Sequence, residues 1–279
     1  MHINKHKLFD AHGNAVRFEA TENQSGKLVG NKPRFVIIHY TANGSARGTV
    51  DYFTNPSNKV SAHLVVGHDG EVTQMVPFNE RAWHAGRSSW MGRDGLNAYS
   101  VGVEIVNWGK LQGAAGRWKT WTGTPIADDR VIEAAHRHHP GHVTGWEVFD
   151  EAQVQTVAGI VRALGDTYGI APDAVLGHDD ISPQRKSDPG PAWDMRRFRA
   201  MLGGRAEDDA AMAVFEVNAR RGLNMRAGPG IDHERIKLLA NGTQVSAIET
   251  DGLWWLVAEI RDGAEDDTGW VHSHWLAPR

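Results

Sequence analysis

The sequence predicts an α/β domain, with a mixed sheet flanked by helices, followed by a small all-β barrel domain. Up to residue 202, β-branched apolar runs alternate with stretches whose apolar residues recur at helical spacing. After residue 213 the helical spacing disappears, and short apolar runs are separated by Asn-Gly and Asp-Gly turns. We therefore predict domains at 1–202 and 214–279, joined by a small, charged linker at 203–213.

The composition is that of an ordinary globular protein. The 279 residues, 41% of them hydrophobic, are enough for one moderate and one small domain. The net charge is −4 and no long basic block occurs, so we expect no nucleic-acid partner. The N-terminus lacks the apolar core of a signal peptide, and no run approaches the ~20 apolar residues of a membrane span.

The first 40 residues lead to a histidine. Residues 1–34 are polar and irregular, and we assign them no function. The β-branched run 35–40 predicts a buried strand that ends at His39. After a turn at 41–45, Ala46, Val50 and Phe53 share one face of a predicted helix. Residues 60–77 then read as a hairpin around a His-Asp-Gly turn, with His63 opposite the apolar face.

Two chemically notable segments follow the hairpin. The long loop 78–97 carries Trp83 and His84, which favours a binding surface and, equally, a structural histidine bonded to backbone. In the predicted strand 100–107, Glu104 lies opposite the face formed by the apolar residues Val101, Val103 and Ile105. A buried acid needs a polar pocket or a cation, for which a metal site or Lys186 would serve. The alternative is an edge-strand glutamate facing solvent.

Residues 108–149 show no clear hydrophobic period, and we expect an extended loop or insertion at the rim of the candidate functional site. The histidine-rich tract 136–142 could bind a second metal, but it lacks a carboxylate companion, so a solvated face is favoured. A long helix is predicted next, because Asp150 and Gln153 form a capping-box pattern and Gly169 provides an end.

The segment 177–191 contains three prolines and two glycines, which predict a stiff loop without regular helix. It carries His178, Lys186 and Asp188, and a helix at 193–202 follows. The chain has no cysteine, so a zinc ion could be held only by histidine and carboxylate. With His39, these residues supply two histidines and one carboxylate, which is the ligand set of an open catalytic zinc site.

The C-terminal segment predicts short strands near 238–239, 244–248, 254–260 and 269–271. The whole chain contains eleven tryptophans and only four tyrosines. Their flat apolar rings suit stacking on sugars, and core packing is the alternative reading.

The motifs at His39, 61–63, 83–86, 100–104 and 177–191, taken in this order, closely resemble those of the zinc N-acetylmuramoyl-L-alanine amidases. These are relatives of phage lysozyme-type amidases and peptidoglycan recognition proteins, and the resemblance covers residues 30–203. It implies a mixed, mostly parallel central sheet. The stretch from the hairpin to Glu104 is most similar to the branch that recycles muropeptides. The tail, with 222–230 and 269–272, resembles a bacterial Src-homology-3-like domain, which implies cell-wall binding.

The resemblance also implies a mechanism. His39, His178 and Asp188 would hold one zinc ion, which polarises the amide carbonyl between N-acetylmuramic acid and L-alanine and lowers the pKa of a water molecule. Glu104 would transfer the proton from water to the leaving amine, and Lys186 would stabilise the oxyanion. The residues expected at the substrate rim are His63, Trp83 and His84.

The expected partners are peptidoglycan or muropeptides, and the chain is expected to be a monomer. Two alternatives remain open. One is a non-catalytic peptidoglycan-binding receptor of the same fold, and the other is a cytoplasmic amidase that recycles anhydro-muropeptides. A wall-lytic enzyme would instead act in the periplasm or outside the cell, without a recognisable signal peptide.

Overall fold

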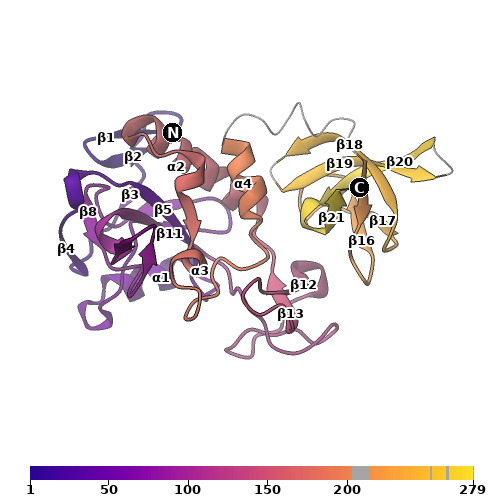
Figure 1. Cartoon of the computed structure of the whole chain (residues 1–279), viewed down its shortest axis with the longest axis horizontal. Coiled ribbons are helices and arrows are strands. Elements are labelled where there is room, and N and C mark those ends of the chain that lie inside the picture. The colour runs from indigo at the N-terminus through magenta and orange to yellow at the C-terminus, as the bar shows by residue number, and fades with distance from the viewer. Residues whose placement is uncertain (203–213, 252, 262–263, 279) are drawn as a thin grey trace. The chain divides into compact units, whose positions relative to one another are not determined.

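The computed structural model describes residues 1–202, 214–251, 253–261 and 264–278 (Figure 1). The chain forms two compact units, Met1–Met195 and Arg196–Arg279, and each is described separately below. The predicted linker 203–213 lies outside the described residues. Among the helices of the described part, none is long and apolar enough to cross a membrane.

A six-stranded sheet forms the centre of the N-terminal unit, in the order β14-β5-β11-β6-β7-β3. Neighbouring strands are parallel except in the β6–β7 hairpin. This confirms the predicted mixed, mostly parallel sheet. The central strands β5 and β11 are almost wholly buried, which explains why both read as continuous apolar runs. The bounds are β3 Arg17–Phe18, β5 Phe35–Tyr40, β6 Leu64–Val66, β7 Val72–Gln74, β11 Ser100–Ile105 and β14 Val175–Gly177.

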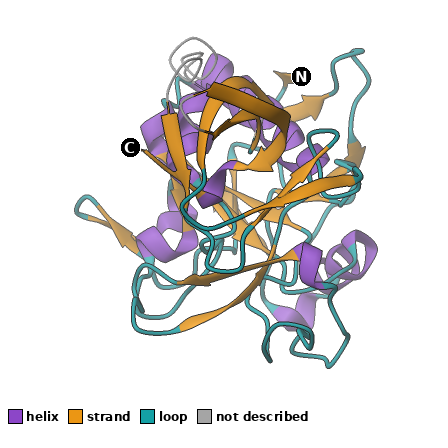
Figure 2. Cartoon of the chain, turned by 90° about the vertical axis from the view of Figure 1, so that its right-hand side faces the viewer, coloured by secondary structure: helices purple, strands orange, loops and turns teal. Residues whose placement is uncertain are grey.

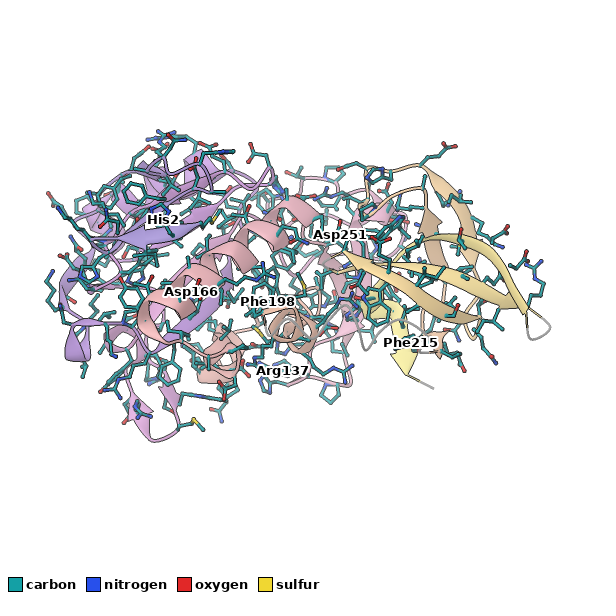
Figure 3. The ribbon with its side chains drawn as sticks, turned by 90° about the horizontal axis from the view of Figure 1, so that it is seen from above. His2, Arg137, Asp166, Phe198, Phe215 and Asp251 are labelled. Atoms are coloured by element: carbon teal, nitrogen blue, oxygen red, sulfur yellow. The ribbon has the colours of Figure 1, made fainter. Side chains whose placement is uncertain are left out.

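The main helices follow their sequence signals. Helix α1 (Ala46–Thr54) begins where the Ser45 side chain accepts a hydrogen bond from the Gly48 amide, and it buries Val50 and Phe53. Helix α2 (Glu151–Tyr168) has the predicted capping box and ends at Gly169, whose φ of 75° is left-handed. Asp166, labelled in Figure 3, lies on its exposed face. Helix α4 (Met195–Leu202) begins two residues later than predicted.

Two expectations for local structure were wrong. The first 34 residues include short strands, and a one-turn helix, α3 (His178–Ile181), opens the segment expected to lack helix. The Asp180 side chain accepts a 2.7 Å hydrogen bond from the Gly177 amide, and this cap permits a turn that periodicity cannot reveal. Besides β3, the short strands of the first 34 residues are β1 His2–Asn4, β2 Lys7–Phe9 and β4 Gln24–Lys27. Three more lie in the predicted loop 78–97: β8 Glu80–Ala82, β9 Ser89–Trp90 and β10 Arg93–Asp94.

The segment 108–149 is not merely an extended loop, because it contains an antiparallel hairpin. Strands β12 (Val131–Ala135) and β13 (Val143–Glu147) pair along their whole length and are drawn in pink in Figure 1. Trp118, Ile132 and Trp146 are buried, so this insertion has apolar packing of its own.

The C-terminal unit is an antiparallel seven-stranded sheet that curls around an apolar interior, which confirms the all-β prediction (Figure 2). Its strands follow the order β17-β16-β20-β19-β18-β15-β21. Val217, Met225, Val245, Val257 and Val271 are fully buried there. The bounds are β15 Val214–Val217, β16 Leu223–Arg226, β17 Arg235–Leu239, β18 Gln244–Asp251, β19 Trp254–Arg261, β20 Ala264–His272 and β21 Leu276–Pro278.

Candidate metal centre

The site begins on two neighbouring strands of the central sheet. His39 is the penultimate residue of β5, and Glu104 is the penultimate residue of β11. The strands are parallel, and these two residues are register partners, so their side chains leave the same face of the sheet side by side. His39 is only 1% exposed, and Glu104 is also buried.

The other two candidate ligands come from the segment after β14. This strand is the parallel neighbour of β5, so its C-terminal end delivers His178 to the same sheet edge as His39. The chain then returns, and the Asp179 amide donates a 2.9 Å hydrogen bond to the Asp188 carbonyl. This bond fixes Asp188 beside His178.

The structure brings His39, His178 and Asp188 together. His39 Nδ1, His178 Nδ1 and Asp188 Oδ2 lie 2.9 Å from one another. Neutral imidazoles and a carboxylate offer lone pairs at these atoms, and a cation satisfies all three at once. Donors this close can all reach one zinc ion at its usual bond lengths of about 2.0–2.2 Å. His39, His178 and Asp188 therefore form a group that could hold a metal ion.

The outer nitrogens of both histidines have acceptors, which frees each Nδ1 for a metal. His39 Nε2 lies 3.0 Å from His84 Nδ1, and His178 Nε2 lies 3.1 Å from the Ala85 carbonyl. His84 in turn contacts the Ser100 hydroxyl through Nε2 at 3.3 Å. Neighbours of this kind fix the tautomer and orientation of metal-binding imidazoles.

Burial and charge keep the ligands in the protonation states that a metal needs. Burial, reinforced by His178, lowers the pKa of His39 to about 4, so its imidazole is neutral at pH 7. Burial alone would raise the pKa of Asp188, but its close contacts with the His178 and His39 side chains lower it well below its ordinary value. Asp188 is therefore a carboxylate at neutral pH.

Glu104 is the second acid of the site. Its Oε2 atom is buried and has no hydrogen-bond partner. Burial, and next the nearby charge of Asp188, raise the pKa of Glu104 well above 4.5, whereas the charge of Lys186 lowers it. Lys186 is half-buried and acts electrostatically on both Glu104 and His39. An acid and a cation thus border the three candidate ligands.

The three residues expected at the substrate rim differ in their surroundings. His63 is fully buried, with Nε2 on the Glu80 carbonyl and Nδ1 accepting from the Gly102 amide. His84 is buried with both nitrogens occupied, as described above. Trp83 is half-buried, and its indole N–H donates to the Ser25 hydroxyl. Of the three, only Trp83 keeps part of its ring open to solvent.

The histidine-rich tract is exposed at residues 137–142, as expected of a solvated face, but its first residue is an exception. His136 is buried, and its Nε2 lies 3.0 Å from Asp179 Oδ2. Arg137, labelled in Figure 3, pairs with the carboxylates of Asp179 at 2.6 Å and Asp180 at 2.8 Å. Burial raises the pKa of Asp179 to about 6, and Arg137 opposes this shift. The carboxylate companion of the tract is thus Asp179, the residue after His178. Through this contact the tract binds the loop that carries two of the candidate ligands.

A second contact that stabilises the candidate ligands was also not predicted from the sequence. The Tyr40 hydroxyl lies 3.1 Å from the Ser187 hydroxyl, which joins the residue after His39 to the residue before Asp188. Burial raises the pKa of Tyr40 to about 12, so this phenol stays protonated. In the sequence, the only indication of a role for Tyr40 and Ser187 was that each lies next to an expected ligand.

Two protein families match this chain. The family described as N-acetylmuramoyl-L-alanine amidase matches residues 29–191, and the family described as bacterial SH3 domain matches residues 221–277. The 1,6-anhydro-N-acetylmuramyl-L-alanine amidase AmpD of Escherichia coli is 34% identical over 161 residues, which cover 56% of this chain and 68% of the relative.

Two further similarities span comparable parts of the chain. N-acetylmuramoyl-L-alanine amidase A of Achromobacter lyticus is 41% identical over 181 residues, covering 62% of this chain and 85% of the relative. A solved complex of the E. coli amidase AmiD with a substrate is 28% identical, with a TM-score of 0.48, and covers 73% of this chain and 68% of that one.

Proposed function

The chain belongs to the N-acetylmuramoyl-L-alanine amidase family, and we propose that it cleaves peptidoglycan as a zinc-dependent amidase through the centre at His39, His178 and Asp188. The bond is the amide between the lactyl group of N-acetylmuramic acid and L-alanine. The observation that carries this proposal is the convergence of two imidazole nitrogens and one carboxylate oxygen, 2.9 Å apart, beside the buried acid Glu104.

Zinc is the metal that these donors fit best. Nitrogen from histidine and oxygen from a carboxylate are ordinary zinc ligands, and three protein ligands leave a coordination position for catalysis. When bound, zinc supplies Lewis-acid polarisation of a carbonyl and acidification of water. His84 and the Ala85 carbonyl hold the two imidazoles in the orientation that presents Nδ1.

Glu104 is proposed as the proton-transfer group. Its carboxyl group is buried on the strand next to His39, and its raised pKa brings it closer to neutrality, where an acid–base group works efficiently. In the charged form, Glu104 accepts a proton from the attacking water. In the protonated form, it donates that proton to the amine of L-alanine as the amide bond breaks.

Lys186 is proposed to stabilise negative charge on the carbonyl oxygen during attack. Its ammonium group is half-buried in the same loop as Asp188, and its charge already influences Glu104 and His39. Lys186 therefore lies in the same loop as a candidate metal ligand, where its charge can act on the carbonyl oxygen.

For the remaining predicted residues we propose two different roles. Trp83 borders the substrate with its half-exposed ring. His84 and His63 have a structural role in the centre, because neither ring nitrogen of either residue is free to contact a ligand. The bacterial SH3-like domain is proposed to attach the enzyme to the cell wall.

A recycling amidase for soluble anhydro-muropeptides is the second candidate, favoured by the 34% identity to a relative named for that substrate. A non-catalytic receptor is disfavoured, because all three candidate ligands are present. Mass spectrometry of products from whole sacculi and from anhydro-muropeptides, each with and without a chelator, tests these possibilities. Release of L-alanine-terminated peptides from sacculi, abolished by the chelator, supports wall cleavage. Cleavage of soluble fragments alone supports recycling, and binding without products supports a receptor.

A further inference from the structure

One tryptophan is displayed to solvent at the tip of a tight turn. Trp121 follows Thr120 in a turn closed by a 3.0 Å hydrogen bond from the Gly123 amide to the Thr120 carbonyl. Trp121 is 63% exposed and is the only one of the eleven tryptophans, all of them within the described residues, that is exposed to this degree. A large aromatic ring usually gains free energy by burial, and a ligand that covers Trp121 would supply that gain.

The exposed ring is held in place. Its indole N–H donates a 2.8 Å hydrogen bond to the Ala42 carbonyl. The ring of Trp108 packs edge-on against it, with centroids 6.5 Å apart. Trp108 itself lies so close to Gly44 that a Cβ there would be 2.7 Å from its Nε1 atom. We call Trp108 and Trp121 the tryptophan shelf.

The tryptophan shelf borders the metal centre. Ala42 follows His39 by three residues, which span at most about 11 Å even when fully extended. The residue after Trp108, Gly109, packs against the ring of Tyr40, where an added Cβ would come within 2.2 Å of the ring. The Tyr40 hydroxyl contacts Ser187, next to the candidate ligand Asp188. A chain of contacts through Gly109, Tyr40 and Ser187 therefore connects the tryptophan shelf to the candidate ligands.

The surroundings of Trp121 suit a neutral, hydroxyl-rich ring. The turn 120–124 carries no charged residue, and it exposes the hydroxyls of Thr122 and Thr124, whose Oγ1 atoms lie 3.3 Å apart. Thr120 is buried, and its Oγ1 lies 2.7 Å from Thr122 Oγ1. A sugar ring can place its C–H face on an indole while its hydroxyl and amide groups bond to such neighbours. The peptide stem, with its charged groups, would instead require ionic partners.

We propose that the tryptophan shelf is a glycan subsite, which binds a hexosamine ring adjacent in the glycan strand to the muramoyl residue whose peptide is removed. This inference rests on the proposed amidase function and extends it to the substrate class. It makes a single-sugar muropeptide the poorer substrate, because such a molecule leaves Trp121 uncovered. Specificity for polymeric glycan would then come from the part of the insertion that precedes β12.

The test compares two substrates in the full-length protein. One is a glycan oligomer that carries peptide stems, and the other is N-acetylmuramoyl-peptide with a single sugar. Trp121→Ala should raise KM for the oligomer about tenfold, equivalent to ~1.4 kcal/mol, and leave kcat and the single-sugar KM unchanged. Trp121→Phe should restore oligomer binding to within about threefold of the wild type, because a flat ring remains. Tyr52→Ala, which removes a 54% exposed aromatic ring on α1, should change neither substrate's KM.

A binding measurement separates this inference from the proposed activity. Calorimetry with a peptide-free glycan oligomer requires no turnover, and Trp121→Ala should weaken binding about tenfold. If the wild type cleaves neither substrate, the proposed amidase function fails, and calorimetry alone decides the glycan subsite. Equal binding by wild type and Trp121→Ala would overturn the subsite. An equal KM increase for both substrates would also overturn it and would point to the peptide stem or to a structural role.

Discussion

Glu104 provides a prediction in which activity and stability should move in opposite directions. Its carboxyl group is buried, Oε2 has no hydrogen-bond partner, and burial followed by the charge of Asp188 raises its pKa well above 4.5. Glu104→Gln keeps the size of the side chain but removes both its charge and its ability to accept a proton. The buried amide should be tolerated better than the buried carboxylate.

The expected magnitudes follow from these two losses. Removing a general acid–base group should lower kcat by about 10²–10⁴, equivalent to roughly 3–5 kcal/mol in the activation barrier. Removing a buried acid without a full set of partners should raise the free energy of unfolding of the metal-free protein by about 1–3 kcal/mol. Because the folded state holds the Glu104 proton more tightly than the unfolded state, Glu104 costs more stability as pH rises above 4.5. The gain from Glu104→Gln should therefore be larger at pH 8 than at pH 5.

Three measurements on the same preparation check this prediction. They are the release of L-alanine-terminated peptide, the zinc content, and urea unfolding in chelator at pH 5 and pH 8. Glu71→Gln, which alters an exposed acid, is the matched control and should change none of them. A normal rate with bound zinc in Glu104→Gln would remove Glu104 from the mechanism. A loss of stability at pH 8 would refute the argument from burial.

Three further predictions concern the surroundings of the metal centre. Arg137→Ala should weaken zinc affinity about tenfold in a competition assay, because Asp179 next to the ligand loop loses its ion pair. His84→Ala should weaken zinc affinity about 10–100-fold, because it removes the acceptor that orients His39. Burial lowers the pKa of His63 from 6.5 to about 4, so protonation of the unfolded chain should cost about 2 kcal/mol of stability between pH 7 and pH 5. Urea unfolding in chelator should show a smaller pH dependence in His63→Gln.

These predictions have matched controls. Arg117→Ala alters an exposed arginine, and His68→Ala alters a histidine that pairs with Asp150 away from the ligands. Neither substitution should change zinc affinity. Equal affinities in Arg137→Ala and the Arg117 control would contradict the bracing role of Arg137, and a normal affinity in His84→Ala would contradict the orienting role of His84. An unchanged pH dependence in His63→Gln would show that another group governs the acid response.

The central elements of the fold could be predicted because their signals are local. Strand β5 is a continuous apolar run, and α2 carries both a capping box and a terminal glycine. Asn-Gly and Asp-Gly turns marked the C-terminal strands in the same way. Each of these features depends on residues that are neighbours in sequence.

The missed features depend on contacts across long sequence separations or on very short elements. Helix α3 is a single turn, too short to show a helical period, and the β12–β13 hairpin has no simple alternation. The partner of His136 is Asp179, 43 residues later, so no local pattern could reveal the pair. The same is true of Tyr40 and Ser187, which only the folded chain brings together.

The most direct test of the central claim is zinc content measured together with amide cleavage during stepwise zinc addition to chelator-treated protein. If His39, His178 and Asp188 hold the catalytic ion, activity on sacculi should rise linearly and saturate at one zinc per chain, and Asp188→Ala should neither retain zinc nor regain activity. Full activity in the zinc-free protein, or normal zinc binding by Asp188→Ala, would contradict the account.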